Sequence, residues 1–208
     1  MPRVAGQIDT RKREAILDAA AALFAEKGPA ASMDEIARRA GVSKQTLYNR
    51  FASRVELGRA LAGRRSDLIT EPLRHAGDAE DVLTAFAAAL LAKVCTGEKG
   101  ATLRAVAMMS GESPDLARAI YDAGPMESLR RLADWLETQN RAGRLHAPDP
   151  MAAAEMFAGM TLGHAHLRHM MAVPHPEMDV DERARDTARR NLRAVSLARS
   201  STSISGWG

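Results

Sequence analysis

The chain has 208 residues, of which 46% are apolar, 26% are charged and 4% are aromatic. Ala, Leu, Arg and Met, which favour helices, are abundant, whereas the β-branched and aromatic residues of sheets are scarce. This composition excludes an all-β fold, and the single cysteine, Cys95, excludes a disulfide framework. The N-terminus lacks the apolar core of a secretory signal and the longest apolar stretch, 82–95, is too short to span a bilayer, so we expect a cytoplasmic protein with no membrane contact.

The charges of the chain are unevenly distributed. Residues 1–55 contain 10 Lys and Arg against 6 Asp and Glu, whereas the rest of the chain contains 19 against 20. A basic segment favours contact with a polyanion, because Lys and Arg near phosphates displace condensed counterions. A basic face that is merely solvated explains these numbers equally well.

Capping signals divide the N-terminal segment into short helices. We expect the first helix to begin at Asp9 or Thr10, either of which can cap it. Ser32 and Glu35 then form a capping box for a second helix that should end at Gly41.

A third short helix follows after the three-residue turn Gly41-Val42-Ser43, with Ser43 as its cap. Two short helices joined by such a glycine-containing turn are typical of the helix-turn-helix motif. Gly41 permits the positive φ that the turn needs, and Leu47 anchors the third helix to the core. The polar side chains of residues 44–49 are then left to project outward, where a helix can enter the major groove of DNA.

The outward side chains of this third helix suit base and phosphate recognition. Gln45 and Asn49 can offer paired donors and acceptors to base edges. Lys44 can reach a guanine or a phosphate, and Thr46 a thymine methyl group or a phosphate. A capping box at 53–56 opens a fourth, longer helix that leads out of this basic head.

The segment REAILDAAAALFAEKGPAASMDEIARRAGVSKQTLYNRFASRVEL resembles the N-terminal DNA-binding domain of the TetR family of bacterial transcriptional regulators. The similarity extends from about Arg11 to Leu57 and is much denser than that of a generic helix-turn-helix. It implies that the helix at 44–51 is the recognition helix. The residues that it implies for DNA contact are Ser32 and Tyr48 on phosphate, Ser43, Lys44, Gln45, Thr46 and Asn49 facing the groove, and Arg54, where the family usually has Lys, on the phosphate backbone.

Some of these residues have a second interpretation that does not involve DNA. Ser32 and Ser43 are explained as helix caps, and Tyr48 could pack against the first helix. The exposed polar side chains at 44–49 have no comparable role in a core, which favours DNA contact for them.

Beyond residue 57 the pattern predicts helices throughout. The fourth helix should continue through Leu61 and Leu68, and a wide apolar face from Leu83 to Val94 is typical of a buried helix. We expect further helices around 101–110, from Ser113-Pro114, at about 150–171 and at 180–198, with a kink or break at Gly124-Pro125, an end at Gly143 and a disordered tail at 200–208.

The segment LARAIYDAGPMESLRRLADWLETQNRAGRLHAPDPMAAAEMFAG is similar to the AefR-like C-terminal subtype of this family. The resemblance implies that the last two long helices pair with those of a second copy in a four-helix dimer interface. Gly159 and Gly163 would leave a bare strip for close helix packing, although packing within one chain explains them equally well. DNA recognition favours a homodimer too, because two-fold dimers bind palindromes.

Nine of the 11 methionines lie between residues 108 and 178, and such flexible side chains suit an adaptable apolar pocket. Sites of this kind lie between the helices of bundles. The candidate ligand-binding residues are Phe86, Met108, Met109, Trp135, Met156, Met160 and His164, although for each of them an ordinary place in the core is the simpler interpretation.

The sequence offers no arrangement typical of metal binding or catalysis. His164, His166 and His169 share one predicted helix, but their spacing is poor for zinc and no acidic residue lies between 156 and 176. We therefore predict no metal and no cofactor, and interpret His164 as a polar group in the pocket or the dimer seam. Cys95 is interpreted as a small buried apolar residue.

The sequence thus predicts an all-α protein with a three-helix helix-turn-helix head and a helical bundle for ligand binding and dimerisation. The expected domains are 9–55 for DNA binding and 56–199 for effector binding and dimerisation, followed by a flexible tail at 200–208. The expected function is that of a dimeric repressor that binds a palindromic double-stranded operator and is released by a small apolar effector. An activator or an effector-independent DNA-binding regulator on the same fold is the alternative, and an enzyme is remote because no catalytic constellation is visible.

Overall fold

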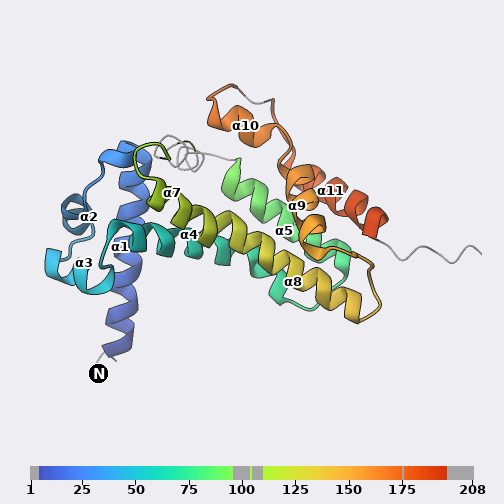
Figure 1. The fold of residues 1–208 in the computed structure, drawn as a ribbon, viewed down its shortest axis with the longest axis horizontal. Helices are drawn as coiled ribbons and strands as arrows, with labels where there is room; N and C mark the ends of the chain where they lie inside the picture. The colour runs from blue at the N-terminus through green and yellow to red at the C-terminus, as the bar shows by residue number, and fades with distance from the viewer. Residues whose placement is uncertain (1–4, 96–103, 105–109, 175, 196–208) are drawn as a thin grey trace, which may run out of the picture.

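The structure is a computed structural model that describes residues 5–95, 104, 110–174 and 176–195. Within these ranges every regular element is helical, which confirms the all-α prediction. The ribbon is elongated, with one hydrophobic core at each end (Figure 1). None of the helices described is long and apolar enough to cross a membrane.

The head consists of α1 (Ala5–Lys27), the short 3-10 turn η1 (Gly28–Ala30), α2 (Met33–Arg39) and α3 (Lys44–Arg50). Its core is formed by apolar side chains that recur at helical spacing. The largest of them are Ile16, Leu17, Leu23, Phe24, Ile36, Leu47, Phe51 and Leu57.

The expected start of the first helix is wrong. α1 already begins at Ala5, so Asp9 and Thr10 lie inside it rather than at its end. The chain between Ala5 and Thr10 contains no proline, and a capping residue does not by itself stop a helix from extending past it. In contrast, α2 and α3 begin at the predicted caps.

α4 (Arg54–Thr70) connects the head to the helical bundle that follows it in the chain, called the body below (Figure 1). Leu57 belongs to the head core and Ile69 to the body core, so this helix takes part in both. Ser53 caps the helix as predicted. The predicted capping box differs in its second bond, because the carboxylate of Glu56 accepts from the backbone N–H of Ala52 at 2.7 Å. The helix continues through Leu61 and Leu68 as expected, and the Leu68 side chain is 52% exposed.

The body core lies between α5 (Ala79–Val94), α8 (Glu127–Arg141), α9 (Pro150–Leu162) and α11 (Val180–Val195). α11 packs along α5, and a short turn η2 (Glu71–Arg74) joins α4 to α5. Among the buried residues are Phe86, Leu90, Leu132, Leu136, Phe157, Ala184 and Ala188.

The predicted kink or break at Gly124-Pro125 takes the form of a π-helical turn. α7 (Pro114–Tyr121) continues through the π-turn η4 (Asp122–Met126) directly into α8. Pro125 has no backbone N–H to donate, and the wider π-turn accommodates it without ending the helix. Gly124 is buried there, and a Cβ at this position would lie 3.4 Å from the Cβ of Ala62 on α4.

The single long helix expected at 150–171 is wrong, because two helices occupy this segment. α9 ends at Gly163, whose φ of +50° breaks the helix, and α10 (Ala165–Met170) follows. The Arg183 guanidinium of α11 donates to the backbone carbonyls of Met160 and Thr161 at the end of α9. This long-range contact satisfies carbonyls that a continuous helix would have used.

Two expectations fall outside the described residues. These are the helix around 101–110, with Met108 and Met109, and the tail at 200–208.

Candidate functional site

The turn between α2 and α3 has the geometry that the sequence predicts. Ser32 Oγ accepts from the backbone N–H of Glu35 and the Glu35 carboxylate accepts from that of Ser32, which completes the capping box. Gly41 has a φ of +65°, and Ser43 Oγ accepts from the backbone N–H of Thr46 at 3.1 Å. These local bonds fix where α2 and α3 begin, and so they help to set the orientation of α3 within the head.

α3 presents a polar face to solvent. Leu47 is fully buried and holds the helix against the head core, while Gln45 and Asn49 lie one turn apart on the exposed side. The Gln45 side-chain amide donates to Asn49 Oδ1 at 2.9 Å. The two amides therefore form a ready pair of hydrogen-bonding groups, which matches the chemistry of base edges in the major groove.

Lys44 lies at the first turn of α3 and is tied to α2. Its Nζ is 2.9 Å from the Asp34 carboxylate and 6.0 Å from the centre of the Tyr48 ring. The hydrogen bond to Asp34 raises the pKa of Lys44. Tyr48 is 40% exposed, so its hydroxyl is not confined to packing against α1.

The start of α2 carries a second electrostatic contact. Lys27 Nζ is 2.5 Å from the Glu35 carboxylate that closes the capping box. This bond, together with those from Ser32, lowers the pKa of Glu35 to about 2. Glu35 is therefore ionised at neutral pH and stabilises the N-terminus of α2.

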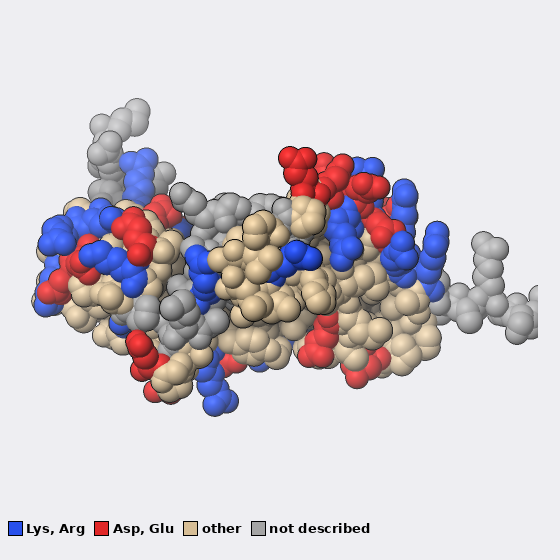
Figure 2. All heavy atoms as spheres, turned by 90° about the horizontal axis from the view of Figure 1, so that it is seen from above, with Lys and Arg blue, Asp and Glu red and all other residues tan. Residues whose placement is uncertain are grey.

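The structure places the predicted DNA-contacting residues at one end of the molecule. Ser43, Lys44, Gln45, Thr46, Tyr48 and Asn49 lie on α3 or at its cap, whereas Ser32 and Arg54 lie at the starts of α2 and α4. The guanidinium of Arg54 stacks 5.8 Å from the centre of the Phe24 ring. Figure 2 shows Lys and Arg side chains gathered at the head end, with acidic groups among them.

The predicted ligand-binding residues are not brought together. Phe86 is buried in the body core, 5.8 Å from the Phe157 ring, and Trp135 is half-buried on α8. Met156 is 66% exposed, Met160 is half-buried, and His164 is exposed between α9 and α10. Met108 and Met109 lie outside the described residues, so only Trp135 of this set lines the groove described next.

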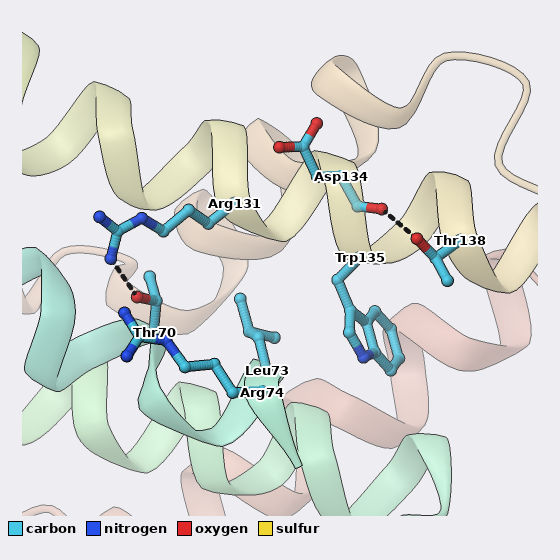
Figure 3. A pocket seen from close by; sticks show the side chains of 7 residues that line it. All are labelled: Thr70, Leu73, Arg74, Arg131, Asp134, Trp135 and Thr138. Carbon is cyan, nitrogen blue, oxygen red and sulfur yellow. Dashed lines mark hydrogen bonds between the residues drawn. The ribbon is translucent and has the colours of Figure 1, made fainter. Parts of the chain in front are cut away.

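A groove of about 360 Å³ lies between the end of α4, η2 and α8 (Figure 3). Leu73 and Trp135 form its apolar part, and the guanidinium groups of Arg74 and Arg131 lie at the Thr70 end. The remaining lining residues are Asp134 and Thr138.

Arg131 is held firmly in this groove. Its Nη1 donates to Asp67 at 2.7 Å and to Thr70 Oγ1 at 3.0 Å, and its Nε donates to Glu127 at 2.8 Å. Partial burial acts to lower the pKa of Arg131, but the hydrogen bonds and charges of Asp67 and Glu127 together outweigh it and raise that pKa. Sequence periodicity gave no sign of these long-range contacts; an arginine four residues after Glu127 was the only local signal.

The histidines and Cys95 show no cluster with metal-site or redox character. The part of the chain that is described contains no group of three His, Cys, Asp or Glu side chains that could hold a metal ion. His166 Nδ1 lies 2.7 Å from the Gly163 carbonyl oxygen, which is a structural contact. Cys95 is half-buried, and burial raises the pKa of its thiol.

Comparison with known proteins covers both the head and the body. A family model described as bacterial regulatory proteins, tetR family, matches residues 16–61. A second model, described as the C-terminal domain of AefR-like transcriptional repressors, matches residues 81–196.

Two solved structures match nearly their whole length. A TetR-family regulator from Mesorhizobium loti has a TM-score of 0.75 and 27% identity, covering 90% of this chain and 98% of that one. The flavonoid-responsive regulator FrrA has a TM-score of 0.67 and 32% identity, with the same coverage of 90% and 98%.

Two curated relatives match through the N-terminal part only. The transcriptional activator FasR of Mycolicibacterium smegmatis is 46% identical over 66 residues, 31% of this chain and 30% of that protein. The transcriptional repressor KstR2 of Mycobacterium tuberculosis is 47% identical over 58 residues, 27% and 28% of the two chains. Each match therefore spans less than a third of the relative's length. Because the AefR-like model alone covers more than half of the 208 residues, and a tetR model covers the head, the chain belongs to the TetR family of DNA-binding bacterial transcriptional regulators.

Proposed function

We propose that the protein is a homodimeric repressor that binds a palindromic operator through α3 and is released by a small effector. In this proposal residues 9–55 bind DNA, residues 56–199 bind the effector and form the dimer, and residues 200–208 are a tail. The observation that carries the proposal is the exposed amide pair of Gln45 and Asn49 on α3, a helix capped by Ser43 and held by the buried Leu47. One such helix contacts few base pairs, so sequence-specific binding requires two copies.

Repression is favoured by the body of the chain. The family model that covers residues 81–196 describes transcriptional repressors, and KstR2, similar in the head, is a repressor. Because the head of FasR, an activator, is equally similar, activation is the second candidate. A reporter gene behind the operator distinguishes the two: deletion of the regulator raises expression if it represses and lowers it if it activates.

A response to a small molecule is supported by the similarity to FrrA, which is responsive to flavonoids and matches over 98% of its length. We propose that an apolar or aromatic effector binds in the body and moves α4. Such an effector must bind the DNA-free state better, by about 1–3 kcal/mol for a usable response.

The DNA part of the proposal is tested by selecting bound duplexes from a random pool with the purified full chain at near-physiological salt. We expect a palindrome to be enriched. Gln45→Ala and Asn49→Ala should each cost about 1–3 kcal/mol in affinity and relax the sequence preference at the contacted bases. Arg118→Ala, on the exposed surface of α7, is the control and should leave the preference unchanged.

Two results would contradict this assignment. One is the failure of a folded, dimeric protein to enrich any sequence. The other is an enriched sequence whose preference survives both substitutions on α3.

A further inference from the structure

The groove between α4, η2 and α8 contains guanidinium donors that the protein does not use. Arg131 engages Nη1 and Nε, and within the described residues its Nη2 has no hydrogen-bond partner. Among the residues that the structure describes, Arg74 has one long contact, from Nη2 to Asp67 at 3.5 Å, and its side chain is 62% exposed. Since a guanidinium has five N–H donors in a planar fork, the two groups together leave room for a bidentate acceptor.

The opposite end of the groove is apolar and flat. In Figure 3 the Trp135 indole and the Leu73 side chain lie between α8 and η2, while both guanidinium groups reach toward Thr70. The carboxylate of Asp134 extends away from Trp135 and from the two arginines, so it does not oppose a negative charge at the Thr70 end (Figure 3). The groove thus joins an aromatic wall to a pair of cationic hydrogen-bond donors.

The acidic side chains near the two arginines, Asp67 and Glu127, are already paired with arginines. Asp67 and Glu127 both bind Arg131, and Arg130 lies 3.6 Å from the Glu127 carboxylate. Arg74 contacts Asp67 at 3.5 Å, a longer separation than the 2.7 Å between Arg131 and Asp67, and its side chain is largely exposed. An arriving carboxylate would gain charge-assisted hydrogen bonds there in competition with Asp67, which contacts both arginines.

We propose that this groove binds a planar aromatic carboxylate, with the ring against Trp135 and Leu73 and the carboxylate on Arg74 and Nη2 of Arg131. The groove borders α4, because Thr70 is the last residue of that helix and Asp67, three residues earlier, accepts a hydrogen bond from Arg131. A ligand that draws the two arginines toward itself weakens this tie between α4 and α8. This consequence for DNA rests on the proposed function, whereas binding to the groove does not.

The test uses the full chain and the probe pair cinnamate and cinnamamide, which share a planar ring and differ in charge. The chain has two tryptophans, Trp135 and Trp207, so its NMR spectrum has two indole N–H signals, and Trp207→Phe assigns them. We expect cinnamate to shift the Trp135 signal and to bind at least about tenfold more tightly than the amide by calorimetry, a difference of about 1.4 kcal/mol.

Arg74→Gln is the critical variant, and it is exposed enough to fold normally. It should abolish the preference for the acid over the amide. Arg141→Gln, on the same helix α8 but paired with Glu137 and not among the residues that line the groove, is the matched control and should retain the preference. No binding of cinnamate at about 1 mM, equal binding of acid and amide, or a preference unaffected by Arg74→Gln would each overturn the proposal.

A separate measurement tests the effect on DNA. We expect cinnamate to weaken operator binding by the wild-type chain and to have no effect on Arg74→Gln. If cinnamate shifts Trp135 but operator affinity stays constant, the binding site stands and its coupling to DNA is overturned. If the protein binds no operator at all, the NMR and calorimetric result still decides the groove, while the proposed function fails independently.

Discussion

Lys44 is paired with a carboxylate in the free protein and is proposed to contact DNA when the operator is bound. Its Nζ contacts the Asp34 carboxylate at 2.9 Å, and both side chains are largely exposed. An exposed pair of this kind contributes little to stability, so it can be exchanged easily for a phosphate or a guanine. Asp34 also places a negative charge close to the proposed DNA surface.

Asp34→Asn should therefore strengthen DNA binding without changing its sequence preference. Removing the carboxylate frees Lys44 and removes repulsion from phosphates, which act on all duplexes alike. We expect several-fold tighter binding to operator and random duplexes, measured by fluorescence anisotropy at several salt concentrations. Asp115→Asn, in the first turn of α7, is the matched control. A gain restricted to the operator would contradict this role of Asp34.

Glu35 gives the head a defined dependence on pH. Its pKa is about 2 in the folded protein, against an ordinary value of 4.5, because it binds Lys27 and Ser32. The lowered pKa means that its stabilising effect is complete above about pH 5 and is lost as the pH falls toward 2.

Glu35→Gln should consequently lower the resistance of the protein to urea at pH 7 and make little difference near pH 2. Unfolding curves at pH 7, 5, 4 and 3 would measure the decreasing gap between wild type and variant. Lys27→Met should also be less stable than the wild type by an amount that decreases as the pH falls, because it removes the largest cause of the lowered pKa of Glu35. A gap that stays constant with pH would show that the ion pair does not contribute.

At the scale of helices, signals that act within a single turn predict a boundary better than contacts between distant segments do, although the expected start of α1 is wrong. The predicted caps Ser32, Ser43 and Ser53 are polar side chains that bond within their own turn, and the structure has all three. The end of α9 depends instead on Arg183, which is more than 20 residues away along the chain. A contact of this length leaves no periodic trace in the sequence, and therefore one long helix was expected there.

The π-turn η4 likewise depends on a contact between distant segments that the local sequence does not predict. Gly124-Pro125 signals a disturbance of the helix, but what holds the turn is packing against α4. Ser128 Oγ donates to the Gly124 carbonyl at 3.0 Å and lies 2.9 Å from Ser66 Oγ on α4, and both hydroxyls are buried. This buried pair fixes α4 against the junction of η4 and α8.

Replacing the two serines tests whether they act as a pair. We expect Ser128→Ala to lower the free energy of unfolding by about 1–2 kcal/mol, because it leaves the buried Ser66 hydroxyl without its partner, and Ser66→Ala to lower it by less, because Ser128 still donates to the Gly124 carbonyl. The double variant should lose about 1 kcal/mol less than the sum of the two. Urea unfolding of the four proteins measures this coupling, and additive losses would mean that the two hydroxyls act independently.

For the whole molecule, the sequence was most informative about the head and least informative about the body. The head depends on short-range caps and on a dense motif, so α2, α3 and the exposed position of Gln45 and Asn49 could be predicted. The body groove brings together the end of α4, η2 and α8, and Thr70 and Arg131 are 61 residues apart along the chain. Composition suggested methionines for a pocket, but Met156 is exposed on α9.

The exposed apolar residues of the body support the proposed homodimer. Several large side chains exposed in the single chain lie in or next to α9 and α10, namely Met156, Leu167, Met171 and Val173. Exposed apolar side chains concentrated in one region are typical of a surface that another chain covers. The region includes α9, one of the two segments that the family resemblance assigns to the dimer.

Met156→Arg should therefore convert the dimer to a monomer and, with it, abolish operator binding. A guanidinium buried in the interface without a partner costs several kcal/mol, whereas in the monomer the same side chain remains in solvent. Light scattering would measure the mass and anisotropy the affinity for DNA. Leu68→Arg is the matched control, since Leu68 is 52% exposed on α4, away from this region. If Met156→Arg remains dimeric while it still binds operator, the interface lies elsewhere. If it becomes monomeric and binds the palindrome unchanged, two copies are not required for recognition, and the proposed mechanism of operator binding is wrong.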